Sequence, residues 1–118
     1  MAQQAPQSFS KISKPQVEFL AEQDGEFEKH VKAAFVRVLG AHKGVREAYL
    51  VLAGYGGSER SVVLCLLAPD ATPLPIVEAV QSEFRSLAGR DMYMDILFLT
   101  SSQREEVIRI ARPFYAAP

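Results

Sequence analysis

Few residues in this chain have types and spacings that support catalysis. A nucleophilic thiol needs a neighbouring base and exposure to solvent, which together lower its pKa. The single cysteine, Cys65, lies between Leu64 and Leu66, so we interpret it as a small buried hydrophobic residue. The histidines His30 and His42 are too far apart to bind one metal ion from neighbouring helical turns. The sequence therefore predicts no catalytic residue, no metal site and no cofactor, which weighs against an enzyme.

A glycine-rich segment is the first candidate for ligand binding. Gly54, Gly56 and Gly57 lie between two predicted strands. A phosphate-binding loop would need a Lys-Ser/Thr pair leading into a helix, whereas a strand follows here. We interpret the segment as a hairpin turn. The alternative is an anion site, in which the amides of Gly56 and Gly57 and the side chain of Arg60 face a carboxylate or phosphate.

Asp95 is the second candidate, because it interrupts the otherwise apolar residues 93–99. A buried carboxylate is costly unless it is paired or neutralised. Arg46 and Arg60 begin neighbouring predicted strands and are the candidate partners. Asp95 is therefore either a strand-end residue that faces water or the polar point of a pocket or interface. The predicted pocket lies near Asp95, Arg60 and the glycine turn.

The elements that must position these residues alternate between strand and helix. Hydrophobic spacing predicts helices over residues 26–39, 76–87 and 103–111. Strands are predicted over residues 45–53, 60–68 and 93–99, with a short strand or arm at 17–20. Asp24 and either Ser101 or Ser102 are the expected caps of the first and last helices. The order (β)-α-β-β-α-β-α predicts an α+β fold, a mixed or antiparallel sheet with helices packed on it.

Length and charge limit the remaining possibilities. A chain of 118 residues is the size of one domain. The polar residues 1–15 are expected to form a flexible N-terminal segment, followed by a single α+β domain over residues 16–118. No apolar run is long enough to serve as a signal peptide or to span a bilayer, which predicts a cytoplasmic protein without membrane contact. The net charge of −1 excludes a simple basic nucleic-acid binder.

Two stretches carry a resemblance to a known family. Residues 45–50, Val-Arg-Glu-Ala-Tyr-Leu, and the close at residues 112–115, Arg-Pro-Phe-Tyr, resemble the C-terminal domain of SseB, the enhanced serine sensitivity protein of bacteria. The order of the elements between them is also similar, and the resemblance covers about residues 16–115. It implies an α+β domain in a bacterial cytoplasm with a link to serine or amino-acid metabolism. It supplies no catalytic residue.

The strand at residues 60–68 is apolar at nearly every position, which is typical of a strand covered on both faces. Two long helices cover one face, and the last predicted helix is short and charged. Soluble monomers rarely expose a large apolar patch, so we expect a two-fold homodimer whose contact includes Val51 and Val63. In the competing arrangement an N-terminal arm of the same chain crosses that face, with Phe9, Ile12, Val17 and Phe19.

Two further aromatic residues are candidates for an interface. Phe114 and Tyr115 lie near the C-terminal end of the chain, where aromatic side chains either pack on their own domain or anchor a partner. Together these features favour a non-catalytic domain that acts through protein–protein contact or self-association. The alternative is a small-molecule or anion-binding sensor or enzyme with its pocket near Asp95 and Arg60.

Overall fold

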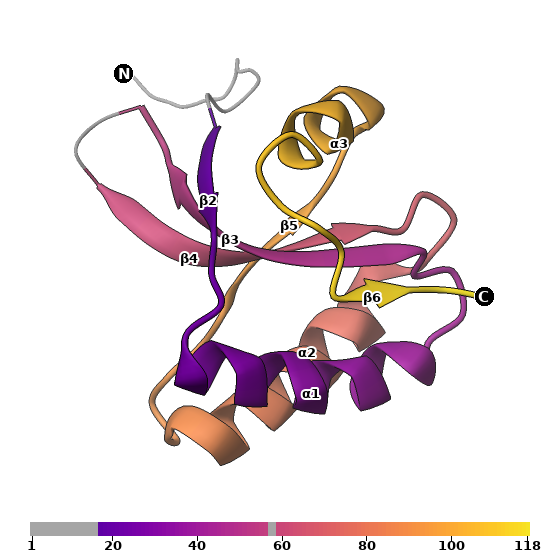
Figure 1. The fold of residues 1–118 in the computed structure, drawn as a ribbon. Coiled ribbons are helices and arrows are strands. Elements are labelled where there is room, and N and C mark those ends of the chain that lie inside the picture. Colours follow the sequence, from indigo (N-terminus) through magenta and orange to yellow (C-terminus); the bar gives the residue numbers. More distant parts are fainter. Residues whose placement is uncertain (1–16, 57–58) are drawn as a thin grey trace, which may run out of the picture.

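The computed structural model describes residues 17–56 and 59–118 and has eight elements (Figure 1). Their order is β2 (Glu18–Glu22), α1 (Glu26–Gly40), β3 (Glu47–Gly54), β4 (Arg60–Leu67), α2 (Pro73–Ala88), β5 (Asp95–Phe98), α3 (Ser101–Val107) and β6 (Tyr115–Ala116). The predicted α+β class is confirmed, and the order matches apart from the added β6. The predictions for residues 1–15 and for Gly57 lie outside the described residues.

The strands form one mixed, five-stranded sheet in the order β2-β3-β4-β5. β3 and β4 pair as an antiparallel hairpin, and β5 is parallel to β4. The other edge of β3 is shared by two strands. β2 pairs with its second half, and β6 pairs with Glu47 and Ala48 in its first half. β3 is thus paired on both sides along most of its length and β4 over Val63–Leu66. The outer side of β5 has no strand among the described residues.

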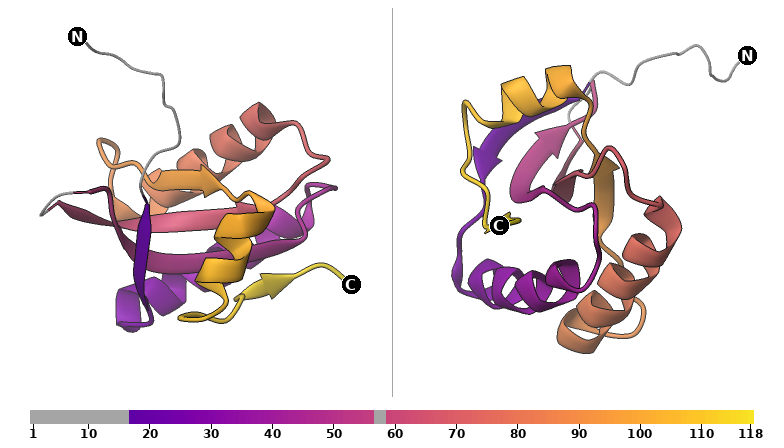
Figure 2. Two further views of the ribbon diagram at one scale, coloured as in Figure 1. Left: turned by 90° about the horizontal axis from the view of Figure 1, so that it is seen from above. Right: turned by 90° about the vertical axis from the view of Figure 1, so that its right-hand side faces the viewer.

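The first core lies between the sheet and the two long helices. Side chains alternate along β3 and β4, so Leu50, Leu64 and Leu66 share the face that α1 and α2 cover. Figure 2 shows these two helices on one side of the sheet and α3 on the opposite side. The helices contribute Val31, Phe35, Leu39, Ile76, Val80 and Phe84 to this core. Most positions of the two apolar stripes are therefore packed as expected, whereas Phe27 and Leu87 are 44% and 39% exposed.

The second core corrects one expectation. Val51 and Val63, proposed as dimer contacts on an open face, are 0% exposed within a single chain. Phe19 of β2 and Val107 of α3 cover them, together with Leu99 and Ala111. A short helix suffices because its one apolar position, Val107, is buried against the sheet while Glu105 and Glu106 are exposed. Phe19 contributes to this face as expected of the N-terminal segment, but from a strand of the sheet, β2, paired with β3, rather than from an arm that crosses the face.

The helix caps differ from those predicted. The N-cap of α1 is Gly25, and no side chain caps it. Thr100, rather than Ser101 or Ser102, caps α3, because its hydroxyl accepts a hydrogen bond from the amide of Gln103 at 3.1 Å. The Gln103 side chain accepts in turn from the amide of Thr100 at 3.0 Å, which makes a capping box. This fixes the direction in which the chain leaves β5.

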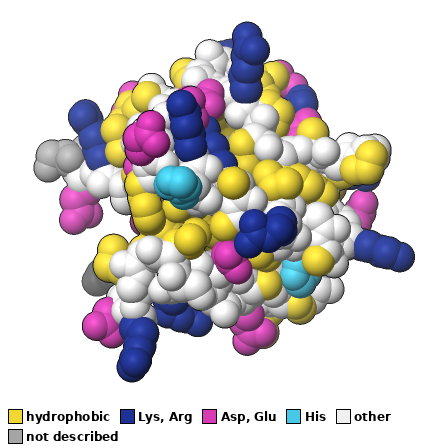
Figure 3. All heavy atoms as spheres, turned by 60° about the horizontal axis from the view of Figure 1, so that its bottom comes forward, with side chains coloured by type: hydrophobic (Ala, Val, Ile, Leu, Met, Phe, Trp, Pro, Cys, Tyr) yellow, Lys and Arg dark blue, Asp and Glu magenta, His cyan; other side chains and the backbone are white. Residues whose placement is uncertain are grey.

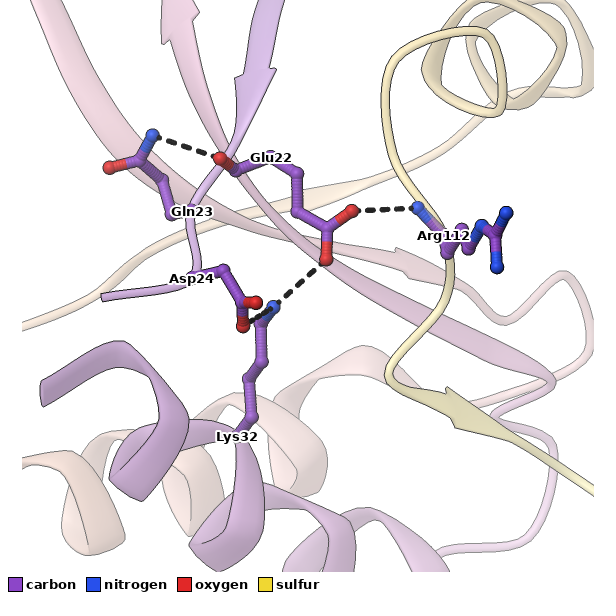
Figure 4. A network of polar contacts seen from close by, with 5 residues as sticks. All are labelled: Glu22, Gln23, Asp24, Lys32 and Arg112. Carbon is purple, nitrogen blue, oxygen red and sulfur yellow. Dashed lines mark hydrogen bonds and ion pairs between the residues drawn. The ribbon is translucent and has the colours of Figure 1, made fainter. Parts of the chain in front are cut away.

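Asp24, the expected cap, belongs instead to a polar network that joins the two ends of the fold (Figure 4). The Lys32 ammonium lies 3.1 Å from a carboxylate oxygen of Glu22 and 3.1 Å from one of Asp24. Glu22 also accepts a hydrogen bond from the amide of Arg112 at 3.1 Å. The network ties β2 to α1 and to the segment after α3.

Among the described residues, no helix has the length and apolar character needed to cross a bilayer.

Candidate functional site

A cleft of about 330 Å³ lies at one end of the layer between the helices and the sheet. The N-terminal part of α1, the C-terminal part of α2, the hairpin of β3 and β4, and the segment that leads into β5 enclose it. Its lining residues are Phe27, Glu28, Val31, Leu50, Ser61, Val62, Phe84, Tyr93, Met94 and Asp95. Figure 3 shows the helical side of the molecule, where hydrophobic side chains lie between charged groups.

The apolar lining of the cleft is an extension of the first core. Phe84 belongs to that core and is 7% exposed. Phe27, one turn before Val31 on α1, meets Phe84 edge to face, with ring centroids 6.5 Å apart and an interplanar angle of 64°. Phe27 is itself 44% exposed. A large aromatic side chain is thus held at the cleft rim by packing on one side and is open to solvent on the other.

The opposite rim is held by Gln81 of α2. Its side-chain oxygen accepts a hydrogen bond from the amide of Met94 at 2.8 Å, and its side-chain nitrogen donates to the carbonyl of Met94 at 2.6 Å. Met94 is 5% exposed, whereas the preceding Tyr93 is 71% exposed. The two hydrogen bonds therefore fix a short extended segment that buries Met94 and projects Tyr93 outward next to Asp95.

A second hollow, of about 340 Å³, adjoins the cleft. Its lining residues are Tyr55, Glu59, Arg60, Ser61, Tyr93 and Asp95, of which the last two and Ser61 also line the cleft. The structure therefore brings Asp95 and Arg60 to one place, as predicted. Burial and, next in size, the carboxylate of Asp95 raise the pKa of Tyr55 above its ordinary value.

Acidic groups outnumber basic ones around the two hollows. Glu28, Glu59 and Asp95 are the carboxylates, and Arg60 is the single cation among the lining residues. None of these groups forms an ion pair with another residue in the described ranges 17–56 and 59–118. Uncompensated carboxylates beside apolar surface favour a ligand that is positively charged and partly apolar. The predicted anion site, formed by the amides of Gly56 and Gly57 with Arg60, stays a prediction, because Gly57 lies outside the described residues.

Several predicted site residues lie elsewhere. Gly56 has a positive φ of 90°, as the turn requires, but it lines a depression beside β2 and α3. Arg46, the other candidate partner of Asp95, instead lies 3.4 Å from Asp70. Phe114 and Tyr115 are half-buried against the first core, so these two aromatic residues pack on their own domain. Gly57 is not among the described residues.

A second polar cluster fastens α3 to the sheet. Nε and Nη2 of Arg104 donate to the two carboxylate oxygens of Glu47 at 3.0 and 2.9 Å. The Tyr49 hydroxyl donates to the same carboxylate at 2.6 Å. The hydrogen bond from Arg104 lowers the pKa of Glu47, and burial is the largest cause that raises the pKa of Tyr49 to about 12. Glu47 is thus held ionised and Tyr49 protonated, which suits a structural tie.

The lone thiol is not part of a reactive site. Cys65 is 0% exposed in the second core, and burial raises the pKa of its thiol to about 12. A thiol with that pKa is almost entirely protonated near neutral pH, so it is a poor nucleophile. Over residues 17–56 and 59–118, no three His, Cys, Asp or Glu side chains gather in a way that could hold a metal ion.

Two residues of the cleft were not found from the sequence. Phe27 was assigned to the buried stripe of the first helix, because its spacing from Val31 fits that stripe. Gln81 gave no signal at all, since a single glutamine within a helix is ordinarily a solvated side chain.

Comparison of the chain with models of protein families, with curated proteins and with solved structures gave no match in any of the three.

Proposed function

We propose that this chain is a non-catalytic binding domain that acts through protein–protein contact at the cleft. The observation that carries the proposal is the combination of a preformed apolar cleft with two exposed aromatic rings at its rim and two carboxylates in its lining. The rings are those of Phe27 and Tyr93, and the carboxylates are those of Glu28 and Asp95. No group in this set is arranged as a nucleophile with its base.

The lining specifies the chemistry of the partner. A Lys or Arg side chain lays its aliphatic stem on apolar or aromatic surface and keeps its charge at the rim. A cation over an aromatic face gains roughly 0.5–1 kcal/mol at an exposed site, and the carboxylates of Glu28 and Asp95 add to this attraction. The favoured partner is a segment in which Lys or Arg residues stand next to aliphatic or aromatic ones.

A small-molecule ligand is the second candidate, and the size of the cleft favours it. Its volume of about 330 Å³ lies at the lower end of the range typical of small-molecule sites. The same charges select a ligand with an amine beside an apolar group, rather than a carboxylate or phosphate. Phenethylamine is a suitable probe, because it carries both features.

Peptide binding tests the proposal. Fluorescence anisotropy with labelled acetyl-Lys-Val-Lys-Leu-Lys-Val-Lys-amide is compared with the same peptide in which every Lys is replaced by Glu. We expect the basic peptide alone to bind, and Glu28→Lys or Asp95→Lys to weaken it about tenfold or more. Glu105→Lys, an equal change of charge on the exposed side of α3, is the matched control.

The outcomes separate the two candidates. Binding of phenethylamine without the peptide, followed by ligand-observed NMR, would replace the protein partner with a small amine. Equal binding of the two peptides, or equal losses in all three variants, would contradict the proposed site.

Self-association is a further part of the proposal, at a surface other than Val51 and Val63, which are buried within one chain. Light scattering over a range of concentrations distinguishes a mass near the 13.0 kDa of one chain from twice that mass.

We also propose the bacterial cytoplasm as the setting, on the basis of the resemblance to the C-terminal domain of SseB. A serine-sensitivity assay in a bacterium that lacks the protein tests the metabolic link.

A further inference from the structure

We infer that the partner segment binds as an added strand on the outer edge of β5, with its apolar side chains on the cleft side of the sheet and its basic side chains on the face that carries Asp95. This inference rests on the proposed function and specifies how the partner is recognised. Strand addition supplies affinity through main-chain hydrogen bonds, and alternate side chains supply specificity.

The outer edge of β5 has no strand partner within residues 17–56 and 59–118. β5 is the last strand of the sheet and pairs with β4 alone among the described strands. Its four residues, Asp95–Phe98, are all half-buried, whereas their partners on β4, Val63, Leu64, Cys65 and Leu66, are fully buried. Over these residues β4 is covered by neighbours on every side, whereas β5 is half-exposed. We infer that the outer edge of β5 is the side that faces solvent.

The direction of the free backbone groups follows from the register. The amide of Leu99 donates to the carbonyl of Leu66 at 2.8 Å, so the amide of residue 99 points at β4. Along a strand these directions alternate, which turns the amides of Asp95 and Leu97 toward β4 as well. The N–H and C=O groups of Ile96 and Phe98 therefore point away from the sheet, where an added strand would meet them.

The cleft and the hollow lie at the beginning of this edge. Asp95 is the first residue of β5 and lines both, and Tyr93 precedes it by two residues. A segment paired with the edge alternates its side chains between the two faces of the sheet. One set, on the cleft side, meets Ile96 and Phe98, which pack on the first core. The other set meets the face of Asp95 and Leu97. The partner is therefore an extended segment in which apolar and basic residues alternate.

A second copy of this chain fits the edge less well. The edge that a second copy would offer is its own β5, which carries Asp95 and no Lys or Arg. Pairing two such edges would add a carboxylate to a region that is already acidic. A basic segment removes the repulsion and satisfies the free backbone groups.

Backbone methylation tests the inference without altering the protein. Two versions of the Lys-Val-Lys-Leu-Lys-Val-Lys peptide are prepared, one N-methylated at its odd positions and the other at its even positions. In an added strand only one of these sets points at β5. We expect one version to bind about tenfold more weakly or worse and the other to retain the affinity of the parent peptide.

A change in the protein tests the same contact from the other side. Ile96→Pro removes one outward N–H and leaves the β4–β5 hydrogen bonds intact, as is tolerated on an edge strand. We expect about a tenfold loss of binding. The thermal midpoint should also fall, because the Ile96 side chain packs on the first core, so Ile96→Ala, which loses that packing but keeps the N–H, is the matched control. If both methylated peptides bind like the parent, strand addition is overturned while the proposed function stands. If the parent peptide does not bind, the proposed function itself fails.

Discussion

The side chain of Gln81 is hydrogen-bonded to both backbone polar groups of Met94. Its oxygen accepts from the Met94 amide at 2.8 Å, and its nitrogen donates to the Met94 carbonyl at 2.6 Å. A side chain of α2 thus takes the place of a neighbouring strand for the residue that precedes β5. The same contact buries the Met94 side chain and turns Tyr93 outward. One polar residue of a helix therefore connects the packing of the first core to the shape of the cleft rim.

Replacing this glutamine is expected to loosen the rim. Gln81→Ala leaves the amide and carbonyl of Met94 without their partner, which costs about 1–3 kcal/mol for a buried group. We expect a lower free energy of unfolding in urea and faster hydrogen exchange at residues 93–95. Gln23→Ala is the control, because Gln23 makes a single 3.3 Å hydrogen bond through its side chain. Equal exchange in the two variants would contradict this role.

The Glu47–Arg104 tie predicts a pH dependence of stability. Arg104 lowers the pKa of Glu47 in the folded state, so the unfolded state binds more protons between the two pKa values. The contribution to stability is therefore complete above the unfolded pKa, which is near 4.5, and is lost as the pH falls through the folded one. We expect Glu47→Gln to destabilise the protein by about 1–3 kcal/mol at neutral pH. Its difference from wild type should shrink toward pH 3, as measured by urea unfolding.

Asp24 is the matched control for that experiment. Its pKa is also lowered, by a hydrogen bond from Lys32, but its carboxylate is exposed and its loss affects a surface pair. Surface pairs contribute little to stability, so Asp24→Asn should leave the pH profile close to that of wild type. A profile for Glu47→Gln that stays parallel to wild type down to pH 3 would show that another carboxylate causes the acid sensitivity.

The burial of Val51 predicts how a charge at this position behaves. Val51→Asp places a carboxylate in the second core without a partner, and the penalty of such burial is large. We expect the variant to unfold or to lose several kcal/mol of stability, with no discrete change from dimer to folded monomer. Val51→Ala, a milder truncation, should cost about 1–3 kcal/mol at unchanged mass. A folded Val51→Asp monomer derived from a wild-type dimer would restore the interface that the sequence predicted.

The second core shows how far the sequence pattern reached. The nearly continuous apolar run in residues 60–68 correctly predicted burial on both faces, because that signal is local. The identity of the cover was not local, since Phe19 and Val107 come from opposite ends of the chain. Two residues of β6 gave no pattern at all. Their pairing with Glu47 and Ala48 depends on the position and direction of the chain where α3 ends.

The candidate site was predictable in part for the same reason. A charge within an apolar run is visible in the sequence, and Asp95 was found with its neighbour Arg60 in this way. In the sequence, Phe27 and Gln81 look like ordinary helix residues. Their role depends on the position of residues 93–95, which the sequence pattern does not give. The acidic character of the lining was not predicted, because Glu28 and Glu59 join Asp95 around the two adjoining hollows only after folding.

The thiol of Cys65 offers a direct measure of native-state opening. Because its pKa is raised to about 12 by burial, a thiol reagent should label it only through transient unfolding. We expect slow labelling in buffer and rapid labelling in urea. Cys65→Ala should lower stability by about 1 kcal/mol and leave peptide binding unchanged. Rapid labelling of the folded protein would show that the second core is open to solvent.

Phe27 separates binding from folding at the cleft. Its ring meets Phe84 at a centroid distance of 6.5 Å, and such a pair is worth about 0.5–1.5 kcal/mol. Because Phe27 is 44% exposed, Phe27→Ser should reduce the free energy of unfolding by an amount of that order. The same substitution removes one of the two aromatic rings at the cleft rim, so the basic peptide should bind about tenfold more weakly.

The matched control for Phe27 is Leu74, which is 63% exposed near the start of α2. It lies ten residues before Phe84, or about 15 Å along the helix, so Leu74→Ser removes exposed apolar surface away from the cleft. Anisotropy titrations of the two variants decide the matter. A loss confined to Phe27→Ser assigns the peptide to the cleft, because the two variants differ in position more than in chemistry. Similar losses in both would mean that the peptide recognises general apolar surface on the helices, and the cleft would then have no special part in binding.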